Sequence, residues 1–246
     1  MSDPTHQPEV TRPQGRSPLV LVCEHASNAF PAPWGDLGLP PEAQSAHIAW
    51  DPGALAVALH LSDRLAAALV AGTVSRLVYD CNRPLEAPDA MPARADTWDV
   101  PGNAALDVPA REARAAAIHD PFHAAVAQQL AARPAPVLVT VHSFTPVMGG
   151  TPRPTEFGIL HDTDTRLADA MLARAPKGRE TRRNMPYGPG DGVTYTLRRH
   201  ALPSGHLNVM LEIRNDLIAD APAQTAIAAL LADWLTAALE DATCSA

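Results

Sequence analysis

The sequence predicts a single α/β domain in which helices flank a mixed, mostly parallel β-sheet. Short apolar runs rich in Val, Leu and Ile recur along the chain, as expected for strands that are buried on both faces. Segments with a helical spacing of apolar residues separate these runs, and this alternation favours a largely parallel sheet. The 246 residues suffice for one large domain, and 46% of them are hydrophobic, enough for a sizeable core.

Charge and composition narrow the class of partner. The net charge is −8 at pH 7 and the chain has no run of Lys or Arg, which argues against nucleic acid as the main partner. No apolar stretch approaches the ~18 residues of a membrane span, so no membrane partner is expected. The three cysteines are widely spaced, which argues against a disulfide framework and favours the cytoplasm. The sequence leaves the oligomeric state open.

The chain is expected to divide into a short tail and one folded domain. Residues 1–16 are polar and contain prolines, without the apolar core of a secretory signal. They are expected to form a flexible N-terminal tail. Residues 17–246 then make up the folded domain.

The first expected strand, residues 19–23, ends in Glu24 and His25. A second apolar run, residues 136–141, ends in His142. In an α/β sheet, ligands bind beyond the carboxyl ends of the strands. Two buried strands that each deliver a histidine there suggest a divalent metal held between them, because imidazole is a common zinc ligand. The alternative is that both histidines only form hydrogen bonds at the strand ends.

A proline- and glycine-rich loop, residues 29–50, separates the first strand from a predicted helix. A short helix is expected near Pro41. Asp51 followed by Pro52 then predicts a helix start with Asp51 as the N-cap, and apolar residues continue with helical spacing to Leu69. Asp51 therefore has a structural explanation as a cap. The alternative is that its carboxylate also reaches the metal.

Residues 73–84 alternate apolar and charged side chains, which predicts a strand. Arg76 is either a surface residue or an ion-pair partner of Asp80. Asn82 and Arg83 place an amide and a guanidinium together before a proline. Because a guanidinium forms a planar fork with a carboxylate, this pair suits a small acidic substrate. The alternative is a surface arginine in a loop.

Residues 84–108 are expected to form a long irregular loop at the rim of the site. Asp107 predicts the cap of a helix that runs to about Ala132. His119 and His123 stand at i and i+4 on one face of this helix. That spacing can bind a metal, but the motif lacks an intervening glutamate, and a packing or pocket-wall role is favoured.

The second half of the chain is expected to supply two more strands and a loop. Residues 157–161 form a short strand candidate that precedes a helix. Residues 182–192 form an open, glycine-rich loop that contains Tyr187 and matches no phosphate-binding motif. This loop either contacts a substrate or is a plain surface loop.

Residues 208–216 are the last strand candidate, and Glu212 lies within its apolar run. Burial should raise the pKa of this carboxyl toward the range where a general base works at neutral pH. The alternative is a salt bridge to Arg214 or another arginine. Residues 220–240 then form an amphipathic helix.

Five motifs together resemble the N-formylglutamate amidohydrolase family. They occur in the expected order and span nearly the whole folded chain. They are Cys-Glu-His-Ala-Ser-Asn at 23–28, His-Ile-Ala-Trp-Asp-Pro-Gly at 47–53, Ser-Arg-Leu-Val-Tyr-Asp-Cys-Asn-Arg-Pro at 75–84, Val-His-Ser-Phe-Thr-Pro at 141–146 and Leu-Glu-Ile-Arg-Asn-Asp-Leu at 211–217.

That family in turn resembles the zinc carboxypeptidase and aspartoacylase group, which implies a zinc-peptidase (phosphorylase/hydrolase-like) architecture. By this resemblance, His25 and His142 match the two histidine ligands of Zn²⁺, although another divalent metal remains open. The wider group has a metal-binding Glu where this chain has Asn28. Asp51 is chosen as the third ligand because a carboxylate is the missing ligand type, with Glu24 and Asn28 left open.

The same resemblance implies the catalytic and substrate-binding residues. Arg76 matches the arginine that polarises the scissile carbonyl, and Glu212 matches the general base. Asn82 and Arg83 match the pair that grips the substrate carboxylate. Beyond the resemblance, Arg214 or Tyr187 is expected to help Asn82 and Arg83 hold the substrate carboxylates.

The resemblance thus implies a metal-dependent amidohydrolase for a small acidic N-acyl amino acid. N-formyl-L-glutamate would give formate and L-glutamate, with Glu212 as the base and residues 17–246 as the catalytic domain. Three alternatives remain open: another N-acyl amino acid or a peptide as substrate, a thiol hydrolase that uses Cys23, and a non-catalytic ligand-binding homologue.

Overall fold

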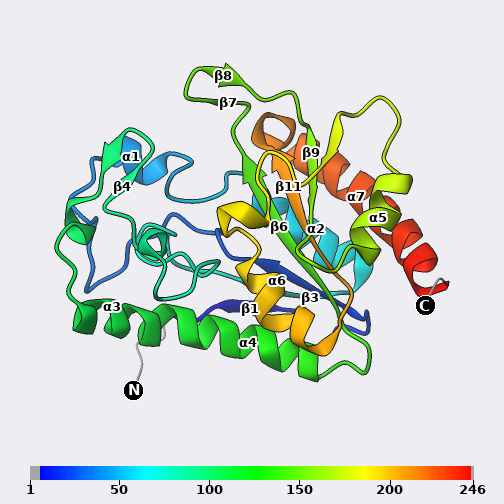
Figure 1. Ribbon diagram of the computed structural model, residues 1–246, viewed down its shortest axis with the longest axis horizontal. Coiled ribbons are helices and arrows are strands. Elements are labelled where there is room, and N and C mark those ends of the chain that lie inside the picture. The colour runs from blue at the N-terminus through cyan, green and yellow to red at the C-terminus, as the bar shows by residue number, and fades with distance from the viewer. Residues whose placement is uncertain (1–5, 245–246) are drawn as a thin grey trace.

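Strands β2 (Leu19–Cys23), β6 (Val137–Phe144) and β11 (Asn208–Arg214) form the centre of a seven-stranded sheet in the computed structural model, which describes residues 6–244. All three strands were expected from their apolar runs. Their side chains are buried on both faces of the sheet, because helices cover each face (Figure 1). The predicted α/β class, with a mixed and mostly parallel sheet between helices, is therefore confirmed.

The strand order is β1-β3-β2-β6-β11-β9-β10. Strands β3 (Ala68–Ala71), β2, β6 and β11 run parallel to one another. Strand β9 (Phe157–Leu160) is antiparallel to β11 and parallel to the edge strand β10 (Thr181–Arg183). The carboxyl ends of the four central strands therefore meet at one edge of the sheet.

Alternate side chains of the central strands enter two separate cores. Leu21 and Val139 pack on the face covered by α2, α5 and α7, whereas Val20 and Leu138 pack on the face covered by α4 and α6. The helices are α1 (Pro41–Ser45), α2 (Ala54–Leu65), α3 (Val108–Arg114), α4 (Asp120–Ala131), α5 (Arg166–Ala173), α6 (Tyr195–His200) and α7 (Ala221–Cys244).

The N-terminal segment contributes to the sheet, contrary to the expected tail over residues 1–16. Strand β1 (Glu9–Thr11) pairs antiparallel with β3, in register from Glu9 opposite Ala71 to Thr11 opposite Leu69. These backbone hydrogen bonds cover the edge that β3 would otherwise expose. Residues 1–5 of the expected tail lie outside the described residues.

The prediction of a strand over residues 73–84 is wrong, because that segment folds as a series of turns. The strand lies earlier, at β3, in a run that the helical spacing had assigned to the preceding helix. Ala66 ends α2 in the left-handed conformation, with φ 49° and ψ 35°, and the chain then turns into β3. Four small or branched apolar residues were too short a run to stand out as a strand.

Asp51 does not cap a helix, although Asp51 and Pro52 predicted that it would. Gly53 is the N-cap of α2, with φ 81° and no side-chain cap bond. A Cβ at Gly53 would lie 2.6 Å from the carbonyl oxygen of Ile218, so both the backbone conformation and the close approach require glycine. The helix start is thereby displaced, and the Asp51 carboxylate is free to turn away from α2.

Other expected elements are present. The helix predicted from Asp107 begins with the carboxylate of Asp107 accepting a hydrogen bond from the backbone N–H of Ala110. It continues through a π-helical turn, Ala115–His119, into α4. The loops also carry two small hairpins that the sequence pattern missed, β4–β5 (Arg94–Ala95 and Trp98–Asp99) and β7–β8 (Val147–Met148 and Thr151–Pro152). None of the helices within residues 6–244 is long and apolar enough to cross a membrane.

We expect Ala66→Gly to raise the free energy of unfolding by about 0.5–1 kcal/mol, measured by urea denaturation. A left-handed conformation costs an L-residue about 1–2 kcal/mol, and glycine avoids this cost. Part of the resulting stabilisation is offset because glycine also increases the conformational entropy of the unfolded chain. The Ala66 side chain is exposed, so no packing is lost. The matched control is Ala56→Gly inside α2, which should lower the free energy of unfolding by about 0.5–1 kcal/mol. Destabilisation at position 66 would contradict this reading of the helix end.

Candidate metal centre and substrate pocket

The carboxyl edge of the sheet gathers the candidate residues from distant parts of the sequence. His25 lies two residues after the end of β2, His142 lies in β6, and Glu212 lies opposite His142 in the parallel register of β6 and β11. The Asp51 loop folds back onto this edge, and the backbone N–H of Asp51 donates to the carbonyl of His25 over 2.9 Å.

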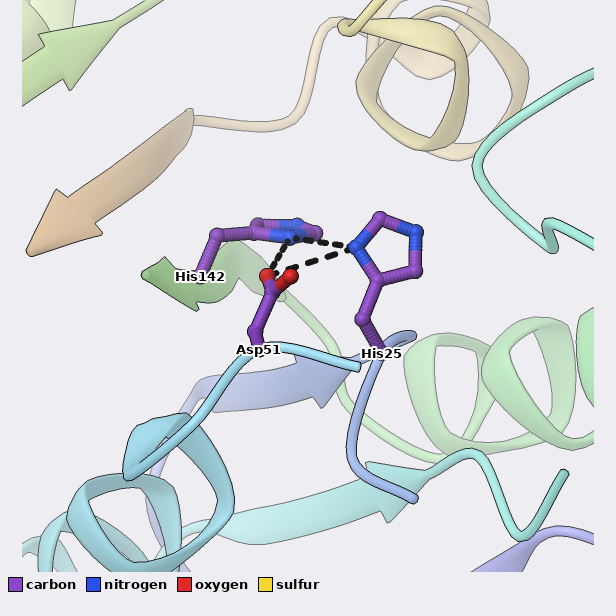
Figure 2. Close-up of side chains that lie close together, drawn as sticks. All are labelled: His25, Asp51 and His142. Carbon is purple, nitrogen blue, oxygen red and sulfur yellow. Dashed lines mark hydrogen bonds and ion pairs between the residues drawn. The ribbon is translucent and has the colours of Figure 1, made fainter. Parts of the chain in front are cut away.

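His25, Asp51 and His142 converge in a buried cluster (Figure 2). Oδ2 of Asp51 lies 3.3 Å from Nδ1 of His25 and 3.0 Å from Nδ1 of His142, and the two nitrogens are 3.2 Å apart. The three residues are at most 4% exposed. The backbone N–H of Ser143 donates to the same carboxylate oxygen and fixes its position.

Each histidine has a carboxylate on its outer side. Nε2 of His25 lies 2.7 Å from Oδ1 of Asp80, and Nε2 of His142 lies 3.1 Å from Oε2 of Glu24. A carboxylate this close to Nε2 favours the tautomer that carries the proton on that nitrogen, which leaves the lone pair of Nδ1 directed into the cluster. Such carboxylate–histidine pairs are the usual outer shell of metal-binding histidines.

This donor set fits a divalent cation. Two imidazole nitrogens and one carboxylate oxygen are directed at a common point in a buried environment, which is the ligand chemistry of a three-residue zinc site. Burial alone would raise the pKa of Asp51, but the neighbouring His25 and His142 outweigh it and hold that pKa below its usual value. Burial would also lower the pKa of His142, yet Glu24 and Asp51 raise it well above its usual value. The cluster thus favours positive charge at its centre.

Arg76 joins two of these carboxylates. Its Nη2 donates to Oδ2 of Asp80 over 2.6 Å, and its Nη1 donates to Oδ1 of Asp51 over 3.4 Å. The side chain is 28% exposed and lines the pocket, so part of the guanidinium faces the space where a substrate would lie. Arg76 therefore braces the outer shell from the pocket side.

Glu212 is buried beside the cluster. It is 4% exposed, and its Oε2 has no hydrogen-bond partner among the described residues. Burial raises the pKa of Glu212 to about 7. An unpartnered carboxylate with such a pKa, in a pocket, is well suited to accept and return a proton.

Gly158 allows the loop over the pocket to approach Glu212. It lies opposite Glu212 in the antiparallel pair of β9 and β11. A Cβ at position 158 would lie 1.9 Å from the carbonyl oxygen of Met185 and 3.0 Å from Cβ of Glu212. The missing side chain lets the loop that carries Tyr187 pack directly on the strand.

These residues enclose a cavity of about 330 Å³. Its wall mixes the cluster, polar residues and a few apolar side chains: His25, His47, Asp51, Arg76, Asn82, Arg83, His142, Ser143, Phe144, Tyr187, Asp191, Val193, Met210 and Glu212. A larger cleft of about 720 Å³ lies at the amino ends of the strands, but its wall is mostly apolar and contains no such cluster among the described residues.

Asn82 and Arg83 line the cavity, but other groups engage their side chains. The Asn82 amide donates to the carbonyl of Val193 and accepts from the N–H and hydroxyl of Thr196. The Arg83 guanidinium donates to Asp89 over 2.6 Å and to backbone carbonyls, including that of Gly192. Both side chains therefore tie the 189–196 segment to the pocket wall.

Tyr187 and Arg214 have different positions. Tyr187 lines the cavity, where burial raises the pKa of its hydroxyl although the neighbouring Arg153 acts to lower it. Arg214 is absent from the cavity wall formed by the described residues. It donates to Asp216 and to the backbone carbonyls of Arg153 and Pro154. Glu212 and Arg214 thus form no salt bridge.

The structure also separates the alternatives for the third position of the cluster. Glu24 faces the outer nitrogen of His142, and the Asn28 amide donates to the backbone carbonyl of Gln44 over 3.0 Å. Asp51 is the carboxylate that faces both Nδ1 atoms. Cys23 is fully buried in the core on the α2 face, and burial raises the pKa of its thiol well above the usual value.

His119 and His123 do not join this cluster. Nε2 of His123 lies 2.9 Å from the carbonyl oxygen of Cys81, and its Nδ1 lies 2.8 Å from Nε2 of His200. His119 contacts the hydroxyl of Tyr195. These contacts pack α4 against α6 and the 80–83 segment, which agrees with the packing role favoured by the sequence.

Sequence reasoning missed the outer roles of Asp80 and Glu24. Asp80 was considered only as a partner of Arg76, and it lies 55 residues from His25 in the chain. The available signal was indirect: a charged residue in a segment otherwise buried, and a glutamate adjacent to a candidate ligand at a strand end.

The chain is similar to known proteins over most of its length. A model of the N-formylglutamate amidohydrolase family matches residues 17–219. A gene product of Agrobacterium tumefaciens with a known crystal structure is 53% identical, with a TM-score of 0.92 and 95% of each chain covered. The crystal structure of N-formylglutamate amidohydrolase from Ralstonia eutropha is 20% identical, with a TM-score of 0.67 and 97% of each chain covered; at this identity the likeness shows the fold alone. None of the curated proteins matches the chain significantly.

We expect Asp80→Asn to weaken the binding of Zn²⁺ by about 10- to 100-fold, because loss of an outer-shell carboxylate weakens the histidine it orients. Competition with a chromophoric chelator measures this affinity. Asp99→Asn is the matched control, since Asp99 is exposed and paired with Arg94 away from the cluster. Equal zinc affinity in the Asp80 variant and the wild type would remove Asp80 from the outer shell.

Proposed function

The chain belongs to the N-formylglutamate amidohydrolase family of linear-amide hydrolases, and on that premise we propose that it hydrolyses N-formyl-L-glutamate to formate and L-glutamate. One observation carries the proposal: a buried His25, Asp51 and His142 cluster lies beside Glu212 in a cavity of about 330 Å³. Such a cavity suits a small molecule. Residues 17–246 form the proposed catalytic domain.

The three cluster residues would hold a divalent metal, with Zn²⁺ favoured by the two imidazoles and one carboxylate. The metal would supply Lewis acidity, which activates water and polarises the acyl oxygen. Asp80 and Glu24 keep the protons of His25 and His142 on their outer nitrogens. The protein thus contributes two imidazole nitrogens and one carboxylate oxygen, held in fixed positions in a buried environment.

Glu212 is the proposed general base and acid. As water adds to the formyl carbon, the carboxylate accepts one of its protons. When the C–N bond breaks, Glu212 returns that proton to the leaving nitrogen, so the products are formate and the free amine of glutamate. Burial raises the pKa of Glu212 to about 7, which supports both directions of transfer.

Arg76 is proposed to stabilise the negative charge that develops on the acyl oxygen. Its guanidinium reaches into the cavity while Asp80 and Asp51 hold it in place. A preorganised donor of this kind contributes about 3–4 kcal/mol to the transition state. Since the ion pairs fix the guanidinium beforehand, little reorganisation is needed during the reaction.

The substrate-binding roles of Asn82, Arg83, Tyr187 and Arg214 remain proposals. The position of Asn82 and Arg83 on the cavity wall supports their proposed roles. A substrate carboxylate would have to share the Arg83 guanidinium with Asp89. Tyr187 offers a hydroxyl near Glu212. Arg214 would act indirectly, through the backbone that it holds.

Two alternatives receive less support. A thiol hydrolase would need an exposed Cys23, and that thiol lies in the core. A different N-acyl amino acid remains compatible with the metal chemistry, because the residues around Glu212 do not by themselves select the acyl group.

The described cysteines form no disulfide, which supports the proposed cytoplasmic location.

The first test pairs metal content with formate release. We expect about one zinc per chain by mass spectrometry, formate release from N-formyl-L-glutamate, loss of activity with chelator and recovery with added zinc. His142→Ala should lose both the metal and the activity, whereas His60→Ala, on the surface of α2, should lose neither. Zinc without formate release would redirect the search to other acyl groups, and absence of both would refute the proposal.

A second test separates the base from the metal ligands. Glu212→Gln should lower kcat by about 10²- to 10⁴-fold, because an amide of the same shape cannot accept the proton. Its zinc content should equal that of the wild type. If kcat stays within about tenfold of the wild-type value while zinc is retained, Glu212 is not the base.

A further inference from the structure

N-formyl-L-glutamate carries two carboxylates, and the cavity offers few free positive groups to bind them. Carboxylates dominate this region, and the two arginines on the cavity wall are already paired. Arg76 is bound to Asp80 and Asp51, and Arg83 is bound to Asp89. A substrate carboxylate that lies far from the metal site therefore needs another positive group to bind it.

Arg153 is an arginine beside the cavity that pairs with no carboxylate among the described residues. It follows the β7–β8 hairpin, which projects from the carboxyl side of the sheet (Figure 1). Its Cζ lies 5.0 Å from the ring centre of Tyr187 and 5.7 Å from that of Phe144. Both rings line the cavity, and Phe144 shares a strand face with His142.

The backbone of Arg153 is held more firmly than its position after a hairpin suggests. Prolines flank it on both sides, which restricts the backbone dihedral angles. Its N–H donates to the carbonyl of Pro146 over 2.8 Å, and its carbonyl accepts from Nη1 of Arg214 over 3.3 Å. The residue is thus preorganised to present its guanidinium.

The side chain itself has weak and replaceable contacts. Its guanidinium contacts Sδ of Met148, the carbonyl of Thr145 and the side chain of Tyr187. None of these neighbours carries a negative charge at neutral pH. A carboxylate that replaced them would gain charge-assisted hydrogen bonds.

The geometry points to Arg153, together with the Tyr187 hydroxyl, as the subsite for the side-chain carboxylate of the substrate. This inference rests on the proposed function. Arg153 lies beyond the rings of Tyr187 and Phe144, outside the residues that form the wall around the cluster. The carboxylate farther from the scissile amide, at the end of the glutamate side chain, is the one that reaches such a position.

This assignment also gives Arg214 a role that the sequence did not suggest. Arg214 was expected to bind substrate, but it binds the carbonyls of Arg153 and Pro154 instead. It is a positioning residue for the subsite. The strand that supplies Glu212 therefore also fixes the residue that selects the substrate.

The test compares N-formyl-L-glutamate with N-formyl-L-glutamine, which differ only in the side-chain carboxylate. Arg153→Gln should raise KM for the glutamate substrate by about 10- to 100-fold, with kcat changed by less than about threefold. The preference for glutamate over glutamine should fall to near unity. Arg153→Lys, which keeps the charge and loses the fork, should be intermediate.

Calorimetry with the zinc-loaded protein provides a readout that does not depend on turnover. The wild type should bind L-glutamate more tightly than L-glutamine, and Arg153→Gln should bind them equally. The matched control is Arg182→Gln, because Arg182 is exposed on β10 and paired with Glu180. It should behave as the wild type in both assays.

Three outcomes would overturn the assignment: an unchanged preference in Arg153→Gln, an equal loss on both substrates, or a wild-type protein that does not distinguish L-glutamate from L-glutamine. A wild type that releases no formate refutes the proposed function instead. In that case, the calorimetric comparison still decides whether Arg153 recognises a carboxylate.

Discussion

The carboxylate of Asp51 joins the parts of the chain on which the candidate site depends. Its Oδ2 faces both Nδ1 atoms and accepts the N–H of Ser143, while its Oδ1 accepts from Arg76. These contacts connect the ends of β2 and β6 to the loop before α2 and to the turns after β3. Removing this carboxylate would leave Nδ1 of both histidines without the negative charge they share, while Asp80 and Glu24 would still face their outer nitrogens.

Burial of four carboxylates makes this arrangement costly in free energy unless positive charge compensates them. Glu24, Asp51, Asp80 and Glu212 are all at most 4% exposed, and Arg76 is the cation directly paired with two of them. Buried carboxylates are costly unless cations or hydrogen bonds compensate them. A cation bound between the histidines would offset part of this cost.

The sequence could predict the parts of the fold and site that depend on short-range pattern. Buried parallel strands appear as apolar runs, so β2, β6 and β11 were found together with His25, His142 and Glu212 at their carboxyl ends. Asp51 was ambiguous, because an Asp-Pro pair is a sound helix-start signal, and only the long-range hydrogen bond to His25 shows that the carboxylate turns away. Alternation over residues 73–84 suggested a strand, but it arises from turns that send Arg76 and Asp80 to the site. The partners of Arg83 and the fixed backbone of Arg153 depend on contacts between distant segments, which a local pattern does not contain.

Gly158 has a consequence for how this protein can be altered by mutation. The strand beside Glu212 and the loop that carries Tyr187 touch at Gly158, so any side chain at this position forces the carbonyl of Met185 outward. The effect would pass along the loop to Tyr187 and change the shape of the cavity roof. Variants with new acyl preferences are therefore to be sought by changing residues of the loop that carries Tyr187. Gly158, which supports that loop, is expected to stay unchanged in any selection for activity.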